Sequence, residues 1–356
     1  MLDFIIIGQG LAGSVLGYML LKREKKILVV DSLYGKSASE VAAGIFNPIT
    51  GKRMLKTWRA DDFFPFMIDF YQNMQNDLKG EFLYLKPIYK PFSSIQEQNH
   101  WVAQTSFADI ENFVSASLNS DTYGDYIFDS FGGFKTCMSG NVEVKTMLEL
   151  CRYYFIENEA FAQDKFSPIE LEVKEDYVQW QNIKARQIIF CEGSRAIGNP
   201  FFNWVPFVPA KGEVLTIEAP GLTNEVIFNK SAFVMPCSKE AFKVGATYEW
   251  DFANEEPSEA GRQEIERKLD GFLKIPYKVI RQEAAVRPTV KDRRPVIGLH
   301  PQYKSLAIFN GMGTKGVSLA PFFANNFCNF LERGEELDAS VNITRFHKLY
   351  YTLQKN

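Results

Sequence analysis

A glycine-rich turn near the amino end has the residue types and spacing needed to hold a phosphate. Gly8-Gln9-Gly10-Leu11-Ala12-Gly13 follows the apolar run Phe4–Ile7 and opens Leu11–Arg23, where apolar residues recur with helical spacing. A second apolar run, Ile27–Val30, ends at Asp31. This is the fingerprint of a dinucleotide-binding βαβ unit, in which a helix N-terminus faces a diphosphate and the acidic residue binds a ribose. The charge of Asp31 disfavours NADP because it would repel a 2′-phosphate.

Each glycine of the turn has its own physical reason. Gly8 allows the sharp bend, Gly10 lets the backbone approach a diphosphate, and Gly13 lets helix and strand pack closely. A turn that binds no ligand is the alternative, and the fingerprint alone does not separate FAD from NAD. The small residues of Ser37–Pro48 suit a backbone that lies against a flat ring system, although an ordinary packed turn fits them equally well.

The remaining pattern predicts the elements that position this turn. A length of 356 residues corresponds to about two domains. The segment Glu81–Phe134 is aromatic and irregular. Outside it we expect buried strands over Ala185–Phe190 and Leu306–Phe309, antiparallel strands over Glu213–Glu218, Ser231–Met235 and Phe242–Gly245, and helices over Asn141–Glu157, from the N-cap Ser258 to Phe272, and over Val317–Arg333 with Gly334 as the terminating residue.

The expected fold is α/β, with two interleaved domains. A Rossmann-like domain with a parallel central sheet takes residues 1–80, 140–208 and 286–356. An antiparallel-sheet α+β domain, inserted into the first, takes residues 81–139 and 209–285 and contacts the substrate.

Composition excludes several classes of protein. The net charge of −3, from 40 basic and 43 acidic residues, provides no basic field for nucleic acid. Five scattered cysteines without a CxxC, and only three histidines, argue against a disulfide framework, a zinc site and a Ser-His-Asp triad. The apolar stretch Phe4–Leu21 is interpreted as strand plus helix rather than as an export or membrane segment, because no basic residue precedes it. We expect a cytoplasmic protein without a membrane span, whose chemistry comes from a cofactor.

Further short motifs follow in a fixed order: Ile5–Gly13, Val29–Asp31, Ala42–Gly44, Lys211–Leu215, Gly245–Glu249, Val286–Thr289 with Asp292, Pro295–Gly298, Gly311–Gly316 and Ala320–Pro321. In this order and spacing they resemble the D-amino-acid-oxidase-like family of FAD-dependent oxidoreductases, which includes glycine oxidase and sarcosine oxidase. The resemblance covers nearly the whole length and implies FAD as the cofactor. It implies non-covalent attachment, because Ala284 and Ala285 stand where a flavin-linking cysteine would be.

The resemblance also implies the residues of the site. The expected cofactor-binding residues are Gly8, Gly10, Leu11, Ala12, Gly13, Asp31, Ser32, Ala42, Ala43, Gly44, Ile45, Ile169, Gly193, Gly313, Thr314, Lys315, Gly316 and Val317. The N-terminus of the last helix and the Lys315 ammonium would stabilise negative charge on a reduced flavin. A solvent-facing lysine is the alternative for Lys315, and a helix cap is the alternative for Thr314.

Arg287 is the principal substrate candidate, and with Lys315 it forms the expected catalytic pair. By resemblance to glycine oxidase, this arginine holds the carboxylate of an amino acid with two parallel hydrogen bonds. A structural ion pair with Asp292 or Glu283 is the alternative. Thr314 stands where glycine oxidase has a second arginine, so recognition of a glycine-like substrate is in doubt.

The expected reaction is oxidation of the C–N bond of a small amine or amino acid, by hydride transfer to flavin N5. Phe233 and Tyr248 are expected as pocket wall, and core packing fits them equally. The Gly44–Pro48 run and the Gly313–Gly316 turn are also similar to the FAD domain of the bifunctional wobble-uridine tRNA-modifying enzyme. The basic residues Lys52, Arg53, Lys56 and Arg59, with Trp58, would then contact an anion or RNA. A flavin- or NAD-binding module without turnover is a third hypothesis, and the sequence leaves the oligomeric state open.

Overall fold

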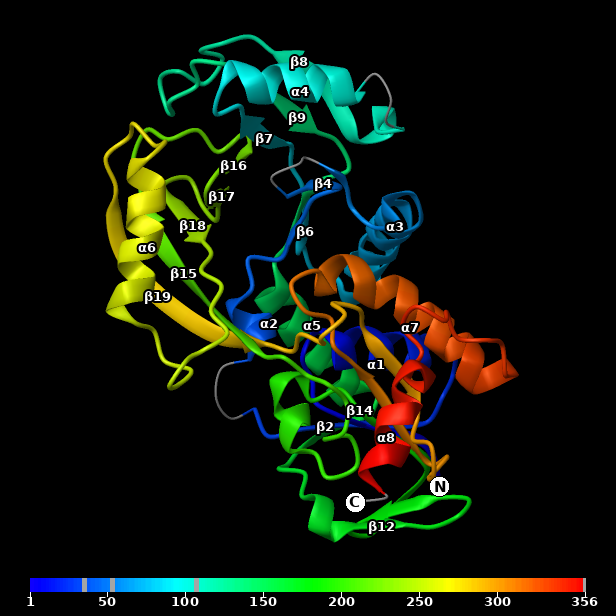
Figure 1. Cartoon of the computed structure of the whole chain (residues 1–356). Helices are drawn as coiled ribbons and strands as arrows, with labels where there is room; N and C mark the ends of the chain where they lie inside the picture. The colour runs from blue at the N-terminus through cyan, green and yellow to red at the C-terminus, as the bar shows by residue number, and fades with distance from the viewer. Residues whose placement is uncertain (34–36, 52–54, 106–108, 355–356) are drawn as a thin grey trace.

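The structure is a computed structural model that describes residues 1–33, 37–51, 55–105 and 109–354 (Figure 1). Its helices are α1 (Leu11–Lys22), α2 (Ala38–Val41), α3 (Ala60–Leu78), α4 (Ile95–Thr105), α5 (Val144–Glu157), α6 (Glu259–Asp270), α7 (Gly316–Arg333) and α8 (His347–Leu353). Short 3₁₀ turns lie at Glu111–Phe113, Pro168–Glu170, Gly193–Gly198 and Ile343–Phe346.

One of the two large sheets has eight strands, and its central strands are parallel. Its strands are β1 (Leu2–Ile7), β2 (Ile27–Asp31), β11 (Phe161–Gln163), β12 (Leu171–Val173), β13 (Val178–Trp180), β14 (Ile183–Phe190), β20 (Val296–Leu299) and β21 (Leu306–Asn310). The pairs β11–β2, β2–β1, β1–β14 and β14–β21 are parallel, and the remaining pairs are antiparallel. Along β1, Phe4 and Ile6 pack with α1 and α7, whereas Ile5 and Ile7 pack on the opposite face, as the two-residue period of a strand requires.

A second sheet of eight strands runs in the order β19-β15-β18-β17-β16-β7-β9-β8. Its strands are β7 (Ile88–Pro91), β8 (Val114–Leu118), β9 (Gly133–Thr136), β15 (Ala210–Glu218), β16 (Ile227–Asn229), β17 (Phe233–Pro236), β18 (Ala241–Gly245) and β19 (Lys278–Arg287). All neighbours are antiparallel except β16 and β7. Figure 1 shows α6 along the outer face of this sheet, where its Ile265 and Leu269 are fully buried.

Two small sheets complete the fold. One pairs β3 (Ile45–Phe46) with β10 (Gly140–Val142) and β6 (Leu83–Leu85), and the other is the hairpin of β4 (Ile49–Thr50) and β5 (Leu55–Lys56). The strands of the two large sheets come from alternating stretches of the chain. We therefore keep as a proposal the division into a Rossmann-like domain of residues 1–80, 140–208 and 286–356 and an antiparallel-sheet domain of residues 81–139 and 209–285.

Many of the 31 phenylalanines of the chain pack in the core. Between α3 and α7, Phe63 and Phe323 lie edge to face at 5.3 Å between ring centroids, and both are fully buried. Trp58, just before α3, stacks on Phe323. Aromatic contacts of this kind add to the area that the rings remove from water. None of the described helices is long and apolar enough to cross a membrane.

The expected α/β fold is confirmed, and several predicted elements match closely. The predicted helix from Ser258 is α6, and the Ser258 hydroxyl accepts a hydrogen bond from Gly261 N–H at 3.0 Å. The predicted end of α7 at Gly334 is confirmed by its left-handed backbone, with φ of 69°. The 19-residue helix α3 and the ten-residue strand β19 were not predicted.

Candidate functional site

A cavity of about 1210 Å³ is lined by residues of both large sheets. It extends past the carboxyl ends of β1, β2 and β14 and the start of α1, and reaches β15, β17, β19 and the turn before α7. Ligands of open parallel sheets bind at this edge, outside the carboxyl ends of the strands. The volume exceeds the ~300–1,000 Å³ that is usual for a small-molecule site. The cavity therefore has room for a long, extended ligand together with a second small molecule.

The glycine turn at one end is shaped as its sequence predicts. Gly8 has a φ of 101°, which other residues rarely adopt. A Cβ atom on Gly13 would lie 1.9 Å from the Gly8 carbonyl oxygen, so only glycine allows this approach of α1 to β1. Gly8, Gly10, Leu11 and Ala12 line the cavity, whereas Gly13 acts from behind by permitting the turn. The Leu11 N–H donates to the Ser39 hydroxyl at 3.0 Å.

Asp31 ends β2 beside this turn and lines the cavity. One carboxylate oxygen accepts from Gln9 N–H at 2.6 Å and the other accepts from Leu33 N–H at 2.7 Å. Each oxygen keeps a second lone-pair direction, so a ribose hydroxyl can still bind. Asp31 thus fixes the glycine turn as well as offering a ribose contact.

Most of the other expected cofactor residues also line the cavity. These are Ser32, Ala42, Ala43, Gly44, Ile45, Gly193, Gly313, Thr314, Gly316 and Val317. Ile169 does not line the cavity: it lies on a 3₁₀ turn and is 96% exposed. Phe166, three residues earlier, lines the cavity in its place.

Three of the polar residues of the cavity wall that sequence reasoning missed are notable. Arg152 comes from α5, Asn229 ends β16, and Glu192 follows β14. Burial raises the pKa of the Glu192 carboxyl to about 6. The hydrogen bond that this carboxyl accepts from the Asn199 amide at 2.6 Å acts in the opposite direction and lowers the pKa. No local pattern marks Arg152 or Asn229, but Glu192 immediately precedes the expected Gly193.

Arg287 ends β19 at the far end of the cavity, and its guanidinium has no carboxylate within 4 Å among the described residues. One terminal nitrogen donates weakly to the carbonyls of Thr247 at 3.3 Å and Lys211 at 3.5 Å. The Tyr248 ring centroid lies 5.3 Å from the guanidinium carbon. Burial lowers the pKa of Arg287, although the group stays protonated at neutral pH. A half-buried cation with this little compensation is poised to take an anion.

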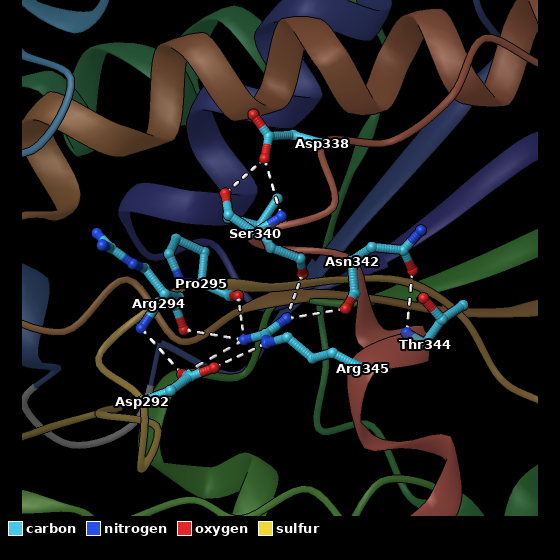
Figure 2. Close-up of polar contacts among 9 residues, drawn as sticks. Asp292, Arg294, Pro295, Asp338, Ser340, Asn342, Thr344 and Arg345 are labelled. Atoms are coloured by element: carbon cyan, nitrogen blue, oxygen red, sulfur yellow. Dashed lines mark hydrogen bonds and ion pairs between the residues drawn. The ribbon is translucent and has the colours of Figure 1, made fainter.

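The structural alternative for Arg287 fails on both proposed partners. Asp292 binds Arg345, whose Nε lies 2.8 Å from its carboxylate, as Figure 2 shows. Glu283 lies 3.9 Å from the exposed Arg281. Both carboxylates are thus directed to other arginines.

Glycine is also required beside Arg287. A Cβ atom on Gly212, in β15, would lie 2.0–2.2 Å from the guanidinium atoms. The Lys211-Gly212-Glu213 motif therefore provides the space for the Arg287 head group. Behind it, the Lys211 ammonium and the Glu213 carboxylate form a buried ion pair at 3.3 Å.

The turn before α7 lines the cavity through Gly313, Thr314 and Gly316, but Lys315 does not. The Lys315 ammonium points to the β4–β5 hairpin, where it donates to the hydroxyls of Thr50 and Thr57 at 3.4 Å each. Burial and the nearby charge of Arg294 lower the pKa of Lys315. The geometry therefore disfavours a direct contact between the Lys315 ammonium and a ligand in the cavity.

The two expected wall residues both line the cavity. Phe233 also packs against Val214 and Ala285, so it serves the core as well. Tyr248 is 37% exposed, and the Trp250 ring meets it edge-on at 4.7 Å between centroids.

The basic segment is largely neutralised where the structure describes it. Lys56 lies 2.8 Å from the Asp61 carboxylate, and Arg59 pairs with Asp62 and Asp338. Lys52 and Arg53 lie outside the described residues. No group of three potential metal ligands was found among the described residues.

FAD, the expected cofactor, fits these observations. The cavity has a helix N-terminus at each end, from α1 and from α7, which suits a diphosphate at one end and an electron-rich ring at the other. Beside Gly313, the Thr289 hydroxyl is buried and has no partner among the described residues. Cys191 is the one cysteine among the residues lining the cavity, and it lies beneath Gly8, far along the chain from the ring-binding turn.

Comparisons with known proteins show what the chain is similar to. The profile of the DAO family, described as FAD dependent oxidoreductase, matches residues 159–328. Glycine oxidase of Bacillus subtilis is 21% identical over 344 residues, which cover 90% of each chain. The solved glycine oxidase of Bacillus cereus superposes with a TM-score of 0.79 at 16% identity, over 94% of this chain and 96% of its own. Iminodiacetate oxidase from a Chelativorans species gives 0.75 at 18% identity, over 96% and 99%.

Proposed function

We propose that the chain is a member of the DAO family of FAD-dependent oxidoreductases, to which it is similar, and that it oxidises the C–N bond of a small amine that carries a carboxylate. FAD is its cofactor, and enzymatic turnover replaces the hypothesis of a passive binding module. The substrate class is inferred from this chain's own site together with its similarity to glycine oxidase and iminodiacetate oxidase.

The observation that carries the proposal is the Arg287 guanidinium. It is a cavity-lining cation whose hydrogen bonds, among the described residues, go to two backbone carbonyls at 3.3 and 3.5 Å. A planar guanidinium binds a carboxylate through two parallel hydrogen bonds, which fixes the orientation as well as the position of the ligand. An amino acid anchored in this way presents its α-carbon in one orientation toward the ring-binding end of the cavity.

Bound FAD would supply the redox chemistry, as the acceptor at N5 of the hydride that oxidises the C–N bond to an imine, which water would then hydrolyse. The protein's part is positioning. Arg287 holds the carboxylate, and Phe233 and Tyr248 form an aromatic wall that limits water around the reacting carbon. The first N–H groups of α7 would stabilise negative charge on a ring bound at that end of the cavity. Lys315 adds its charge from the rear of the turn, without contacting the ligand.

The remaining expectations about partners stay proposals. We favour a small-molecule substrate over tRNA because Lys56 and Arg59 are paired with carboxylates. We also propose a cytoplasmic location and non-covalent FAD. All five cysteines are unpaired, and the cysteine lining the cavity lies at the dinucleotide end.

The test is anaerobic reduction of the FAD-loaded protein by a substrate panel. The panel holds glycine, N-methylglycine, iminodiacetate, D- and L-amino acids, and matched amines that lack the carboxylate. We expect bleaching of the flavin absorbance by at least one carboxylated amine and none by its decarboxylated partner. Bleaching by the amines without a carboxylate, or by modified tRNA alone, would contradict the proposal.

A further inference from the structure

Helix α5 sends one cation into the dinucleotide end of the cavity. Val144, Leu148 and Arg152 are spaced four residues apart, and all three line the cavity. Residues at this spacing lie on one face of a helix. The first two are buried apolar residues, and Arg152 extends the same stripe beside the glycine turn.

A buried glutamine holds Arg152 in place. The Arg152 Nε donates to the Gln9 side-chain oxygen at 2.8 Å. The Gln9 amide nitrogen in turn donates to the Leu148 carbonyl at 2.8 Å and to the Ser14 hydroxyl at 3.2 Å. Gln9 is 3% exposed, and its backbone N–H binds Asp31. Since α1 and α5 both bind the Gln9 side-chain amide and β2 binds its backbone, the guanidinium that Gln9 anchors is pre-positioned.

This anchor leaves most of the guanidinium's hydrogen-bonding capacity unused. An arginine has five N–H donors, and the contact with Gln9 takes only the one on Nε. No carboxylate of the described residues lies within 4 Å of Arg152, whereas Arg59 and Arg345, which lie outside the cavity, are in ion pairs. The terminal nitrogens are therefore available to an anionic ligand.

We propose that Arg152 binds the diphosphate of FAD, opposite the N-terminus of α1, and that Gln9 is its positioning residue. Gln9 lies between Gly8 and Gly10, so it ties Arg152 to the turn that a diphosphate approaches. The diphosphate carries the fixed negative charge of FAD, whereas adenosine and the oxidised ring are neutral. A cation and a helix N-terminus then share the two phosphates from two sides. The inference concerns cofactor affinity and does not depend on the identity of the substrate.

The test measures binding to the full-length apoprotein after FAD is removed. Titration calorimetry with ADP, adenosine and riboflavin separates the diphosphate from its two neutral neighbours, and quenching of flavin fluorescence gives the FAD affinity. The variants are Arg152→Ala and Arg152→Gln. Lys145→Ala, which removes an exposed cation from the same helix, is the matched control.

We expect both Arg152 variants to weaken ADP and FAD by roughly 10- to 100-fold, the usual range for losing a charge-assisted hydrogen bond. Adenosine and riboflavin should bind as they do to the unaltered protein, and Lys145→Ala should change nothing. Gln9→Met should weaken ADP binding less than the Arg152 variants do. It should cause no further loss of ADP affinity in the Arg152→Ala background.

Two results would overturn the inference. One is unchanged ADP affinity in variants whose circular dichroism and thermal midpoint match the unaltered protein. The other is an equal loss of ADP and adenosine, which would place Arg152 on the nucleoside instead. If no amine of the panel reduces the flavin of the unaltered FAD-loaded protein while the Arg152 variants still bind ADP more weakly, the proposed reaction fails and the diphosphate site stands.

Discussion

Removing the Arg287 guanidinium tests the substrate site most sharply. Arg287→Ala leaves the backbone carbonyls of Thr247 and Lys211, which previously accepted its hydrogen bonds, open to water in the cavity. The change removes no ion pair from the fold, because no carboxylate contacts this guanidinium among the described residues. We therefore expect a folded protein that still binds FAD and has lost its carboxylate anchor.

The size of the effect follows from the contacts that a bound carboxylate would make. Two hydrogen bonds between charged groups contribute about 1.5–3 kcal/mol each. Their loss costs about 3–6 kcal/mol in the transition state, or roughly 10²- to 10⁴-fold in kcat/KM. Arg287→Lys keeps the charge but not the paired hydrogen-bond geometry. Its kcat/KM should therefore fall between that of the unaltered protein and that of Arg287→Ala.

The assay is stopped-flow flavin reduction under anaerobic conditions, with the best carboxylated amine of the panel. Arg281→Ala is the matched control, because Arg281 lies on the same strand with its side chain 67% exposed. The control should react like the unaltered protein. If Arg287→Ala also reacted within threefold of the unaltered protein, Arg287 would not be the carboxylate anchor.

Three further outcomes follow from the same geometry. Gly212→Ala places a Cβ 2.0 Å from the Arg287 guanidinium, which must move by about 1.5 Å to restore ordinary contact; we expect a 10- to 100-fold loss in kcat/KM and no further loss in the Arg287→Ala background, measured as a double-mutant cycle. The pKa of Glu192, raised by burial from 4.5 to about 6, means that the folded state retains a proton that the unfolded state releases, so this group's contribution to stability falls as pH rises through that window. Glu192→Gln keeps the Asn199 contact and should raise the free energy of unfolding by about 1–2 kcal/mol at pH 7.5 but not at pH 4; urea titrations that show equal changes at both pH values would refute this. Lys315→Met should leave FAD bound and lower the two-electron flavin potential by about 20–40 mV, corresponding to about 1–2 kcal/mol; an unchanged potential would limit Lys315 to bridging the hairpin.

Local sequence signals predicted the parts of the fold that a few neighbouring residues determine. The strand predicted at Phe4–Ile7 is β1, and the helix predicted at Leu11–Arg23 is α1, which ends one residue earlier. Both depend on the glycine turn between them, where backbone conformation permits few other residues. The N-cap of α6 and the glycine end of α7 were equally local, and both were confirmed.

Elements held by distant partners were harder to predict. Strand β19 alternates little in polarity and is defined by pairing with β15, some seventy residues earlier in the chain. The irregular middle segment contains β7, whose parallel neighbour β16 lies far along the sequence. Helix α3 contains Pro65, a residue type that usually ends or kinks a helix, and this hid the buried stripe that includes Phe63 and Met67.

The site shows the same division. Residues whose backbone forms the site, such as Gly8 and Gly313, were predictable from the motifs and do line the cavity. Arg152 was not, because on α5 it continues a stripe that looks like core, and its contact with Gln9 spans 143 residues. Ile169 was expected from the family resemblance alone, and it lies on a 3₁₀ turn where it is exposed to solvent.

The central claim is that FAD lies extended through this cavity with the substrate carboxylate at Arg287. A crystal structure of the FAD-loaded protein soaked in acetate measures it directly. The account predicts the diphosphate between the start of α1 and Arg152, the ring against Gly313–Gly316, and the acetate paired with the Arg287 guanidinium. A ring bound elsewhere, or an Arg287 turned out of the cavity with the acetate absent, would contradict it.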